Sequence, residues 1–277
     1  MLRRLGTLIV ISFAAAWLLA MPSVLPHVFR TQTRLADLLH RTARAIDASA
    51  WVTQTELARI EDLAAFPEDD LLRRLARSVG MLRITLTDTA GKTITFLCTA
   101  TLIARDTVLT NQHCIEKQAS TDRVTLELWL DHVGEAATIH PVDPLPLEED
   151  GELDYAVLRL ARSPEMSLPL PWPRFQLRAA VTGERLFILH HSGGNPLQVT
   201  RAHCRVTAPD ATRRTVVRHS CATQTGSSGA LLIAERDHAI VGLHRAIRRS
   251  HETSRGIATA ATVLHAKSTV LSRPMPK

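Results

Sequence analysis

The feature that most constrains the fold of this 277-residue chain is a long succession of short segments with the composition of β-strands. They begin near Val79, are separated by turn residues, and read MLRITLTD, TITFLCT, DTVLTN, VTLELWL, YAVLRL, RLFILHH, LQVTRAHCRV, TVVRH, ALLIA and AIVGLH. Helical segments do not alternate regularly with them, which argues against a doubly wound parallel sheet. The pattern predicts an all-β domain, a sandwich or a pair of barrels, followed by a helix within Thr259 to Leu271.

The first residues predict export from the cytoplasm. Two arginines precede an uncharged apolar run at residues 5–21, which is the pattern of a secretory signal peptide or of an uncleaved signal anchor. The run is about 17 residues long, near the lower limit for crossing a bilayer, and Leu18 occupies a position where a cleavage site prefers a small residue. Both interpretations of residues 1–26 stay open, with a buried first helix as a third. In the first two the chain is periplasmic or secreted, and its only membrane contact is this run.

Residues 27–77 predict a helical segment between the signal and the main domain, residues 78–277. Apolar residues recur at helical spacing, a Thr-x-x-Glu capping box opens a second helix, and two aspartates precede a short third one. The apolar positions are Leu35, Leu38, Leu39, Ala43 and Ile46 in the first helix, Leu57, Ile60 and Leu63 in the second, and Leu71, Leu72 and Leu75 in the third. The pattern does not decide between a stalk, a pro-segment and a helical packing layer.

The chain contains four cysteines, Cys98, Cys114, Cys204 and Cys221. In an exported protein they are expected to form disulfides, and four cysteines allow three pairings. Near-equal separations favour two local bridges, Cys98–Cys114 and Cys204–Cys221, each closing a loop of about 16 residues and contributing about 3 kcal/mol of stability. A four-cysteine zinc site is the alternative, and the lack of a Cys-x-x-Cys pair argues against it.

Three short segments supply a histidine, an aspartate and a serine in that order: VLTNQHC with His113, ELDYAVLRL with Asp154, and TGSSGA with Ser228. A serine hydroxyl is a weak nucleophile at neutral pH, so acyl transfer needs an imidazole base. A buried carboxylate must orient that imidazole, and backbone N–H groups must stabilise the developing oxyanion. The order differs from that of subtilisins and of α/β-hydrolases, and the Gly-x-Ser-x-Gly elbow of the latter is absent because Ala230 stands at its last position.

Each member of this set also has a plain structural explanation. A lone histidine at a strand end is more often a packing residue than a base, and an aspartate there is often a turn residue. Ser227 competes with Ser228 as the nucleophile. Asp131 and Asp143 compete with Asp154, although neither opens an apolar strand as Asp154 does.

Composition argues against two other classes of function. The net charge is +6, but the basic residues are dispersed, one tyrosine is present to stack on a base, and no nucleic-acid-binding motif occurs. His190 and His191 suggest a metal site together with His132, His140 or His203, but no His-Glu-x-x-His motif or compact carboxylate set accompanies them. We expect no nucleic-acid partner, no metal and no cofactor.

From about Val79 to Val270 the chain resembles the trypsin/chymotrypsin-like serine peptidases, and most closely their bacterial glutamyl-endopeptidase-like branch. CTATLIARDTVLTNQHC is similar to that family's strand, loop and catalytic-histidine segment, and LDYAVLRL to its catalytic-aspartate strand. HSCATQTGSSGALL resembles the nucleophile segment, and IVGLH the strand that lines the specificity pocket. HHSGGNPLQVT resembles the family's His-Pro-x-Gly-type loop, with Ser192 where proline is common.

The resemblance implies a chymotrypsin-like fold of two six-stranded antiparallel β-barrels with a C-terminal helix. The first barrel would carry His113 and Asp154, and the second Ser228, which the resemblance selects over its neighbour. The N–H groups of Gly226 and Ser228 would form the oxyanion hole. The Cys98–Cys114 bridge would hold the base in position, where a small displacement costs rate. The implied protein is a monomeric serine endopeptidase that cleaves protein or peptide substrates.

The resemblance also bears on activation and specificity. Ser227 stands where animal trypsins carry an aspartate that pairs with a newly cut N-terminus, so we predict that cleavage near residues 77–80 is not needed for activity. Ala222 occupies the pocket-floor position that is aspartate in trypsins, which argues against a Lys or Arg preference. Thr223 and His244 match positions that bind a glutamate side chain in glutamyl endopeptidases, and a hydroxyl and an imidazole can hold a carboxylate. The alternative is that His244 only packs.

Two other functions remain open. The first is an inactive binding or scaffold module on the same fold, against which the complete triad argues, although Ala230 departs from the family's usual residue. The second is an esterase, which would be separated from a peptidase by its preference for ester over protein substrates.

Overall fold

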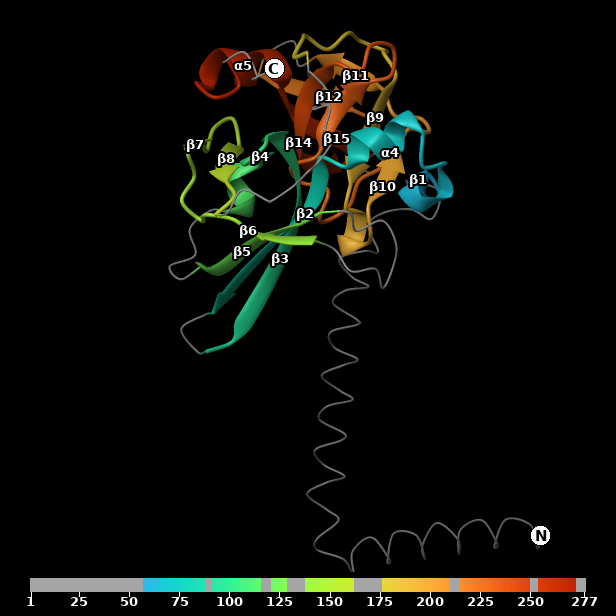
Figure 1. The fold of residues 1–277 in the computed structure, drawn as a ribbon. Helices are drawn as coiled ribbons and strands as arrows, with labels where there is room; N and C mark the ends of the chain where they lie inside the picture. The colour runs from blue at the N-terminus through green and yellow to red at the C-terminus, as the bar shows by residue number, and fades with distance from the viewer. Residues whose placement is uncertain are drawn as a thin grey trace, which may run out of the picture. The chain divides into compact units, whose positions relative to one another are not determined.

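The computed structural model describes residues 57–87, 91–115, 121–128, 138–161, 176–209, 215–249 and 254–272, which belong to one compact unit, Val52–Lys277 (Figure 1). The apolar run at residues 5–21 and the first predicted helix lie outside the described residues. Among the described residues, no helix has the length and apolar character needed to span a membrane.

The described strands form two antiparallel sheets, which confirms the all-β prediction. The first has the order β6-β5-β2-β3-β4-β8-β7, with β2 (Val79–Thr87), β3 (Thr93–Ala104), β4 (Thr107–Thr110), β5 (Thr121–Leu128), β6 (Thr138–Pro141), β7 (Glu148–Asp150) and β8 (Tyr155–Arg159). The second has the order β1-β10-β9-β13-β14-β15-β12-β11, with β1 (Ile60–Asp62), β9 (Leu186–His190), β10 (Gln198–Thr200), β11 (Val206–Pro209), β12 (Val216–His219), β13 (Leu231–Ala234), β14 (Ile240–Arg249) and β15 (Ser254–Ala260).

In the described part of the chain the sheets have seven and eight strands, where six each were predicted. The short strand β7 extends one edge of the first sheet beyond β8. The second sheet gains β1, which pairs with β10. An edge strand leaves backbone N–H and C=O groups unpaired, and an added strand satisfies them.

Several central strands are buried on both faces, which explains why they read as continuous apolar runs. In β9, Leu186 and Ile188 belong to the interior of the second sheet, while Phe187 and Leu189 belong to a cluster that residues of both sheets share. The same alternation holds in β4 and β8 of the first sheet. Successive side chains of a strand point to opposite faces, so each of these strands contributes side chains to two apolar clusters. The two sheets therefore pack against each other through one shared apolar layer.

The segment before the main domain packs against the second sheet. The predicted third helix is present as α4 (Leu71–Ala76), which begins after Asp70, whose side chain accepts a hydrogen bond from Leu72 N–H at 2.7 Å. Of the predicted second helix, the part before Leu57 lies outside the described residues and Leu57 is helical, but Ile60–Asp62 form β1 and Leu63–Ala65 a short 3₁₀ turn, η1. Pairing with β10 satisfies the backbone of β1, and this tertiary pairing overrides the helical spacing of Ile60 and Leu63.

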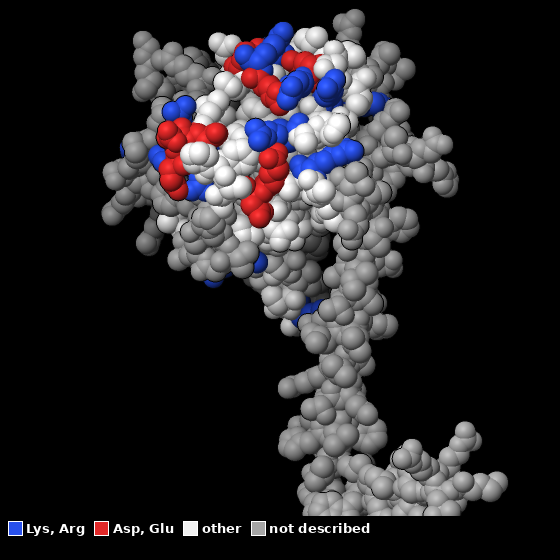
Figure 2. Space-filling view, turned by 90° about the vertical axis from the view of Figure 1, so that its right-hand side faces the viewer, with Lys and Arg blue, Asp and Glu red and all other residues white. Residues whose placement is uncertain are grey.

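Side-chain contacts reinforce this packing. Gln198 donates to Asp62 at 2.9 Å, and Arg201 pairs with Glu61 at 3.0 Å. Figure 2 shows the face of the molecule that carries these elements, and basic and acidic side chains are interspersed on it.

At the C-terminal end the predicted helix is present as α5 (Ala261–Lys267), shorter than the expected range. Its Ala261 and Leu264 enter the shared apolar cluster.

Replacing Leu63 by alanine tests whether this segment belongs to the folded unit. Leu63 is fully buried in the shared cluster, so we expect Leu63→Ala to lower the free energy of unfolding by about 2–5 kcal/mol. Leu145, which is 76% exposed, provides the control, since Leu145→Ala should change stability by less than about 0.5 kcal/mol. Denaturant unfolding of the full chain measures both. Equal midpoints for the two variants would contradict the packing of this segment.

Candidate active site

His113 and Asp154 lie together at the end of the first barrel. His113 sits in the 3₁₀ turn η2 (Gln112–Cys114), which follows β4, and Asp154 directly precedes β8. His113 Nδ1 lies 2.8 Å from Asp154 Oδ2 and 3.0 Å from Oδ1, and the backbone N–H of His113 donates to Oδ1 at 3.0 Å. A carboxylate only accepts, so it fixes the proton on Nδ1 and leaves the Nε2 lone pair available as a base.

The backbone at Asp154 is held in an unusual conformation. Its φ is 54°, in the left-handed region, which aspartate adopts more readily than most residues. Asn111 donates from its side chain to the carbonyl of Asp154 at 2.8 Å. Strands β4 and β8 are paired with Thr110 opposite Ala156. Asn111 directly follows Thr110, and Asp154 lies two residues before Ala156, so both stand at the same end of the paired strands. The sheet register therefore brings the imidazole and the carboxylate together.

Ser228 lies in the loop between β12 and β13, on a tight turn. Ser227 N–H donates to the carbonyl of Gln224 at 3.0 Å, which closes the turn. Gly226 inside it has a φ of 93°, and a Cβ there would lie 2.4 Å from the carbonyl oxygen of His191. Gly229, with a φ of 87°, approaches Thr99 O even more closely. Only glycine fits such positions, so the glycines beside the serine are required by the backbone.

The first barrel anchors this turn through Thr99 on β3. The Thr99 N–H donates to Ser228 O, and its hydroxyl donates to Gly226 O, both at 2.8 Å. The carbonyls of the two loop residues are thus engaged. Their N–H groups donate to no acceptor in the described part of the chain. This is the arrangement of an oxyanion hole, in which aligned donors wait for a developing negative charge.

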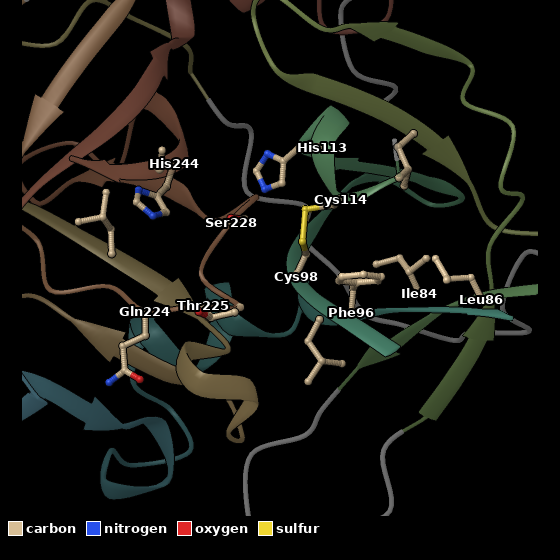
Figure 3. A pocket seen from close by; sticks show the side chains of 15 residues that line it. Ile84, Leu86, Phe96, Cys98, His113, Cys114, Gln224, Thr225, Ser228 and His244 are labelled. Atoms are coloured by element: carbon tan, nitrogen blue, oxygen red, sulfur yellow. A yellow bond between two sulfur atoms is a disulfide. The ribbon is translucent and has the colours of Figure 1, made fainter. Parts of the chain in front are cut away.

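His113, Gly226 and Ser228 line one pocket (Figure 3). In the described residues no hydrogen bond joins His113 Nε2 to Ser228 Oγ, as is common in unliganded sites whose contacts tighten around a substrate. Much of the wall is apolar, and these residues are Ile84, Leu86, Phe96, Leu97, Ile115, Ala246 and Ile247. Phe96, one of these residues, is 45% exposed. The pocket can therefore receive apolar groups beside the triad.

Comparison with known proteins agrees with this geometry. Residues 98–243 match the model of the trypsin-like peptidase domain. The chain belongs to this family, and it is a serine peptidase. No curated protein matches the chain significantly.

Solved structures confirm the chymotrypsin-like fold. The active form of the Mycobacterium tuberculosis protease Rv3671c has a TM-score of 0.55 and 19% sequence identity, over 78% of this chain and 90% of that one. The HtrA-type protease AlgW, whose structure contains a tripeptide, has a TM-score of 0.52 and 20% identity, over 72% of this chain and 62% of that one. These comparisons do not reach the glutamyl-endopeptidase-like branch, which stays a prediction.

Both predicted disulfides of the peptidase are present, Cys98–Cys114 and Cys204–Cys221. The first connects β3 to the residue directly after His113 and borders the pocket. Among the described residues, one group of potential metal ligands comes together, namely Cys98, His113 and Cys114. Its two sulfurs are bonded to each other, so they cannot act as thiolate ligands.

The predicted specificity residues of the peptidase have different surroundings. His244 on β14 lines the pocket, whereas Ala222 and Thr223 do not. The hydroxyl of Thr223 is buried and has no hydrogen-bond partner within the described residues. His244 Nδ1 lies 3.0 Å from Nε2 of His219 on β12, and His219 Nδ1 accepts from Cys221 N–H at 3.3 Å.

Several further residues help to build this site and are not among those predicted from the sequence. They are Thr99, Asn111, Thr200 and His219. All four stand in segments quoted above for the resemblance, but each acts through a contact with another part of the chain, so the segments alone did not reveal these roles. The ring nitrogens of His190, a metal candidate from its sequence, contact Ser227 and Thr200.

Four buried histidines in the second barrel predict that the peptidase loses stability in mild acid. Burial, the largest cause in each case, lowers the pKa of His190 and His244 to about 3 and that of His191 to about 4, and places the pKa of His219 well below its ordinary value. The unfolded chain binds these protons near pH 6.5 and the folded chain does not. Stability is therefore greatest above pH 6.5 and falls as the pH drops below it, by at most about 1.4 kcal/mol per pH unit for each histidine that is protonated only on unfolding.

Denaturant unfolding of the full chain at pH 7.5, 6 and 5 measures this slope. His191→Gln should flatten it, because one buried imidazole is removed. The exposed His265 provides the control, since His265→Gln should leave the slope unchanged. Equal stability at pH 7.5 and pH 5 would contradict the assignment of neutral buried histidines.

Proposed function

We propose that this peptidase is an exported serine endopeptidase whose catalytic residues are His113, Asp154 and Ser228. The observation that carries the proposal is the bonded His113–Asp154 pair in a pocket that also contains Ser228 and two unengaged backbone N–H groups. A base, its orienting carboxylate, a nucleophile and oxyanion donors are the four parts that serine-based acyl transfer needs.

In the proposed mechanism Ser228 Oγ attacks the carbonyl carbon of the scissile peptide bond while His113 Nε2 takes the hydroxyl proton. Asp154 stabilises the imidazolium that forms. The carbonyl oxygen becomes an oxyanion and accepts hydrogen bonds from Gly226 and Ser228 N–H. His113 then gives its proton to the leaving amine, which leaves an acyl-enzyme on Ser228. Water, deprotonated by His113, hydrolyses this ester and regenerates the serine.

Two observations support export. Residues 5–21 have the pattern of a signal peptide or anchor. The two disulfides join all four cysteines of the chain, and structural disulfides are characteristic of oxidising compartments.

Covalent labelling of the full chain by a fluorophosphonate tests the triad. We expect wild-type protein to be labelled, Ser228→Ala to be unlabelled, and Asp154→Asn to lose roughly four orders of magnitude in kcat, because the imidazole tautomer is no longer fixed. Ser227→Ala keeps the nucleophile and should still be labelled. Labelling of Ser228→Ala at the wild-type rate would contradict the proposal. A protein substrate and a simple ester, assayed in parallel, distinguish an endopeptidase from an esterase.

We further propose that the enzyme prefers an acidic residue before the cleaved bond. The direction of the hydrogen bonds behind the pocket supports this preference. Cys221 N–H can only donate, so His219 Nδ1 accepts and a neutral His219 carries its proton on Nε2. That proton is directed at His244 Nδ1, so a neutral His244 carries its own proton on Nε2. The resulting N–H is a donor in a pocket-lining residue, which suits a carboxylate. Thr223 does not itself line the pocket, but it directly precedes Gln224, which does, and its buried hydroxyl has no hydrogen-bond partner among the described residues.

Cleavage of a peptide library by the full chain tests this preference. We expect Glu and Asp to be enriched before the cut. Thr223→Val keeps the shape of the side chain and should reduce the ratio of kcat/KM for a Glu peptide over its Gln counterpart by about 10- to 100-fold, the value of a hydrogen bond to a charged group. A library profile without acidic enrichment would reject the preference and leave the triad proposal unaffected.

A further inference from the structure

Ser227, the residue directly before the proposed nucleophile, belongs to a buried chain of hydrogen bonds. Its Oγ accepts from the N–H of Gln224 at 3.1 Å and lies 2.8 Å from His190 Nδ1. His190 Nε2 lies 3.1 Å from the hydroxyl of Thr200, and that hydroxyl donates to Ala222 O at 3.0 Å. Ser227, His190 and Thr200 are each 0% exposed, so water does not compete for these bonds.

The groups at the two ends of this hydrogen-bond chain determine the direction of every bond in it. A backbone N–H only donates, so Ser227 Oγ must accept from Gln224. A carbonyl only accepts, so the single proton of Thr200 goes to Ala222 O, and Thr200 Oγ must accept from His190 Nε2–H. A neutral imidazole with its proton on Nε2 has an acceptor at Nδ1, which receives the proton of Ser227. Each donor in the chain thus has one acceptor.

The surroundings of His190 keep its ring neutral, as this arrangement requires. Burial lowers the pKa of His190 to about 3, with smaller contributions from His244 and His191. An imidazolium would present a donor to Ser227 Oγ, and the serine proton would lose its acceptor. The cost of an unsatisfied buried hydroxyl adds to the cost of burying the charge.

Both ends of this hydrogen-bond chain lie on the loop between β12 and β13, which carries Ser228. The bonds connect Ser227 to His190 on β9, His190 to Thr200 on β10, and Thr200 to Ala222 of the same loop. The turn that carries the Gly226 and Ser228 N–H groups is thereby bonded to side chains of the second barrel at two points. Ser227 contacts His190, and the carbonyl of Ala222 accepts from Thr200. Thr99 holds the same turn from the first barrel.

We propose that His190 is a positioning residue that holds the oxyanion-hole loop in its active conformation through this neutral hydrogen-bond chain. The proposal rests on the function proposed above, in which Gly226 and Ser228 N–H bind the oxyanion. The resemblance places at Ser227 the aspartate that pairs with a newly cut N-terminus in animal trypsins, whereas here Ser227 bonds to His190. The loop is therefore ordered without proteolysis.

The segment before the main domain supports this chain of bonds. β10 lies between β9 and β1, and Ile60 is the residue of β1 that pairs with Thr200. The backbone that would have to be cut to make a new N-terminus is buried and bonded, since Ser78 is 1% exposed and both its N–H and its hydroxyl donate to Leu75 O. The uncut segment thus contributes to the active arrangement.

Variants of the full chain that break single links test the proposal. Thr200→Val keeps the shape and removes one hydroxyl, and His190→Leu removes both ring nitrogens. For each we expect kcat per titrated active site to fall about 10- to 100-fold, less than the 10²- to 10³-fold loss typical of deleting an oxyanion donor outright. KM for a peptide substrate should stay within about twofold, because ground-state binding does not use the oxyanion. The affinity for a peptide boronate, whose tetrahedral adduct uses the oxyanion hole, should fall in parallel with kcat/KM.

Three comparisons separate positioning from a general loss of structure. Ser227→Thr keeps the hydroxyl and should retain more activity than Ser227→Ala. Thr107→Val removes a buried hydroxyl of the first barrel that bonds to Asp106 and should leave kcat and boronate affinity at wild-type values. Active-site titration counts the folded, reactive molecules in every sample.

The proposal is overturned if Thr200→Val and His190→Leu keep kcat within twofold of wild type, or if they change KM alone. Failure of the proposed function gives a different result, since Ser228→Ala would then remain active whatever happens in the His190 variants.

Discussion

Thr99 forms the contact on which the rest of the site depends. Its N–H and hydroxyl bind the carbonyls of Ser228 and Gly226, its own carbonyl accepts from Thr110, and its hydroxyl also accepts from the N–H of His191. One residue of the first barrel thus binds two loops of the second barrel. The preceding residue, Cys98, is bonded to Cys114 beside the imidazole base. A two-residue stretch of β3 therefore sets the relative position of nucleophile, oxyanion donors and base, which need agreement to within a fraction of an ångström.

Among its described residues the second barrel contains four buried imidazoles, those of His190, His191, His219 and His244. His190 and His219 each lie in a chain whose direction a backbone N–H determines at one end. In both chains the neutral ring is the form in which the donors and acceptors match. A buried ion pair would cost desolvation that these neutral chains avoid. The interior thus contains hydrogen-bonded polar groups without a buried charge. Because these rings stay neutral in the folded chain, we predict that acid lowers its stability.

Much of the fold and of the site followed from local sequence. The apolar strands, both disulfides and the helices α4 and α5 were predicted, and the structure contains them. The predicted pairing of His113 with Asp154 is present, and the two glycines beside Ser228 adopt positive φ angles. These features depend on covalent spacing, on side-chain periodicity or on backbone conformations that few residue types allow. They are visible in a sequence for that reason.

The errors arose where a distant contact outweighed a local preference. Ile60 and Leu63 have helical spacing, yet Ile60 lies in strand β1, which pairs with β10, and Leu63 lies in the 3₁₀ turn that follows. The adjacent His190 and His191 suggest a metal, but the two rings have separate partners, because His190 ends strand β9 and the chain turns at His191. The sequence by itself determined the chemical groups, their order and the strands that carry them. The tertiary structure decided which side of each group is free to react, because the direction of a proton depends on partners that only folding brings together.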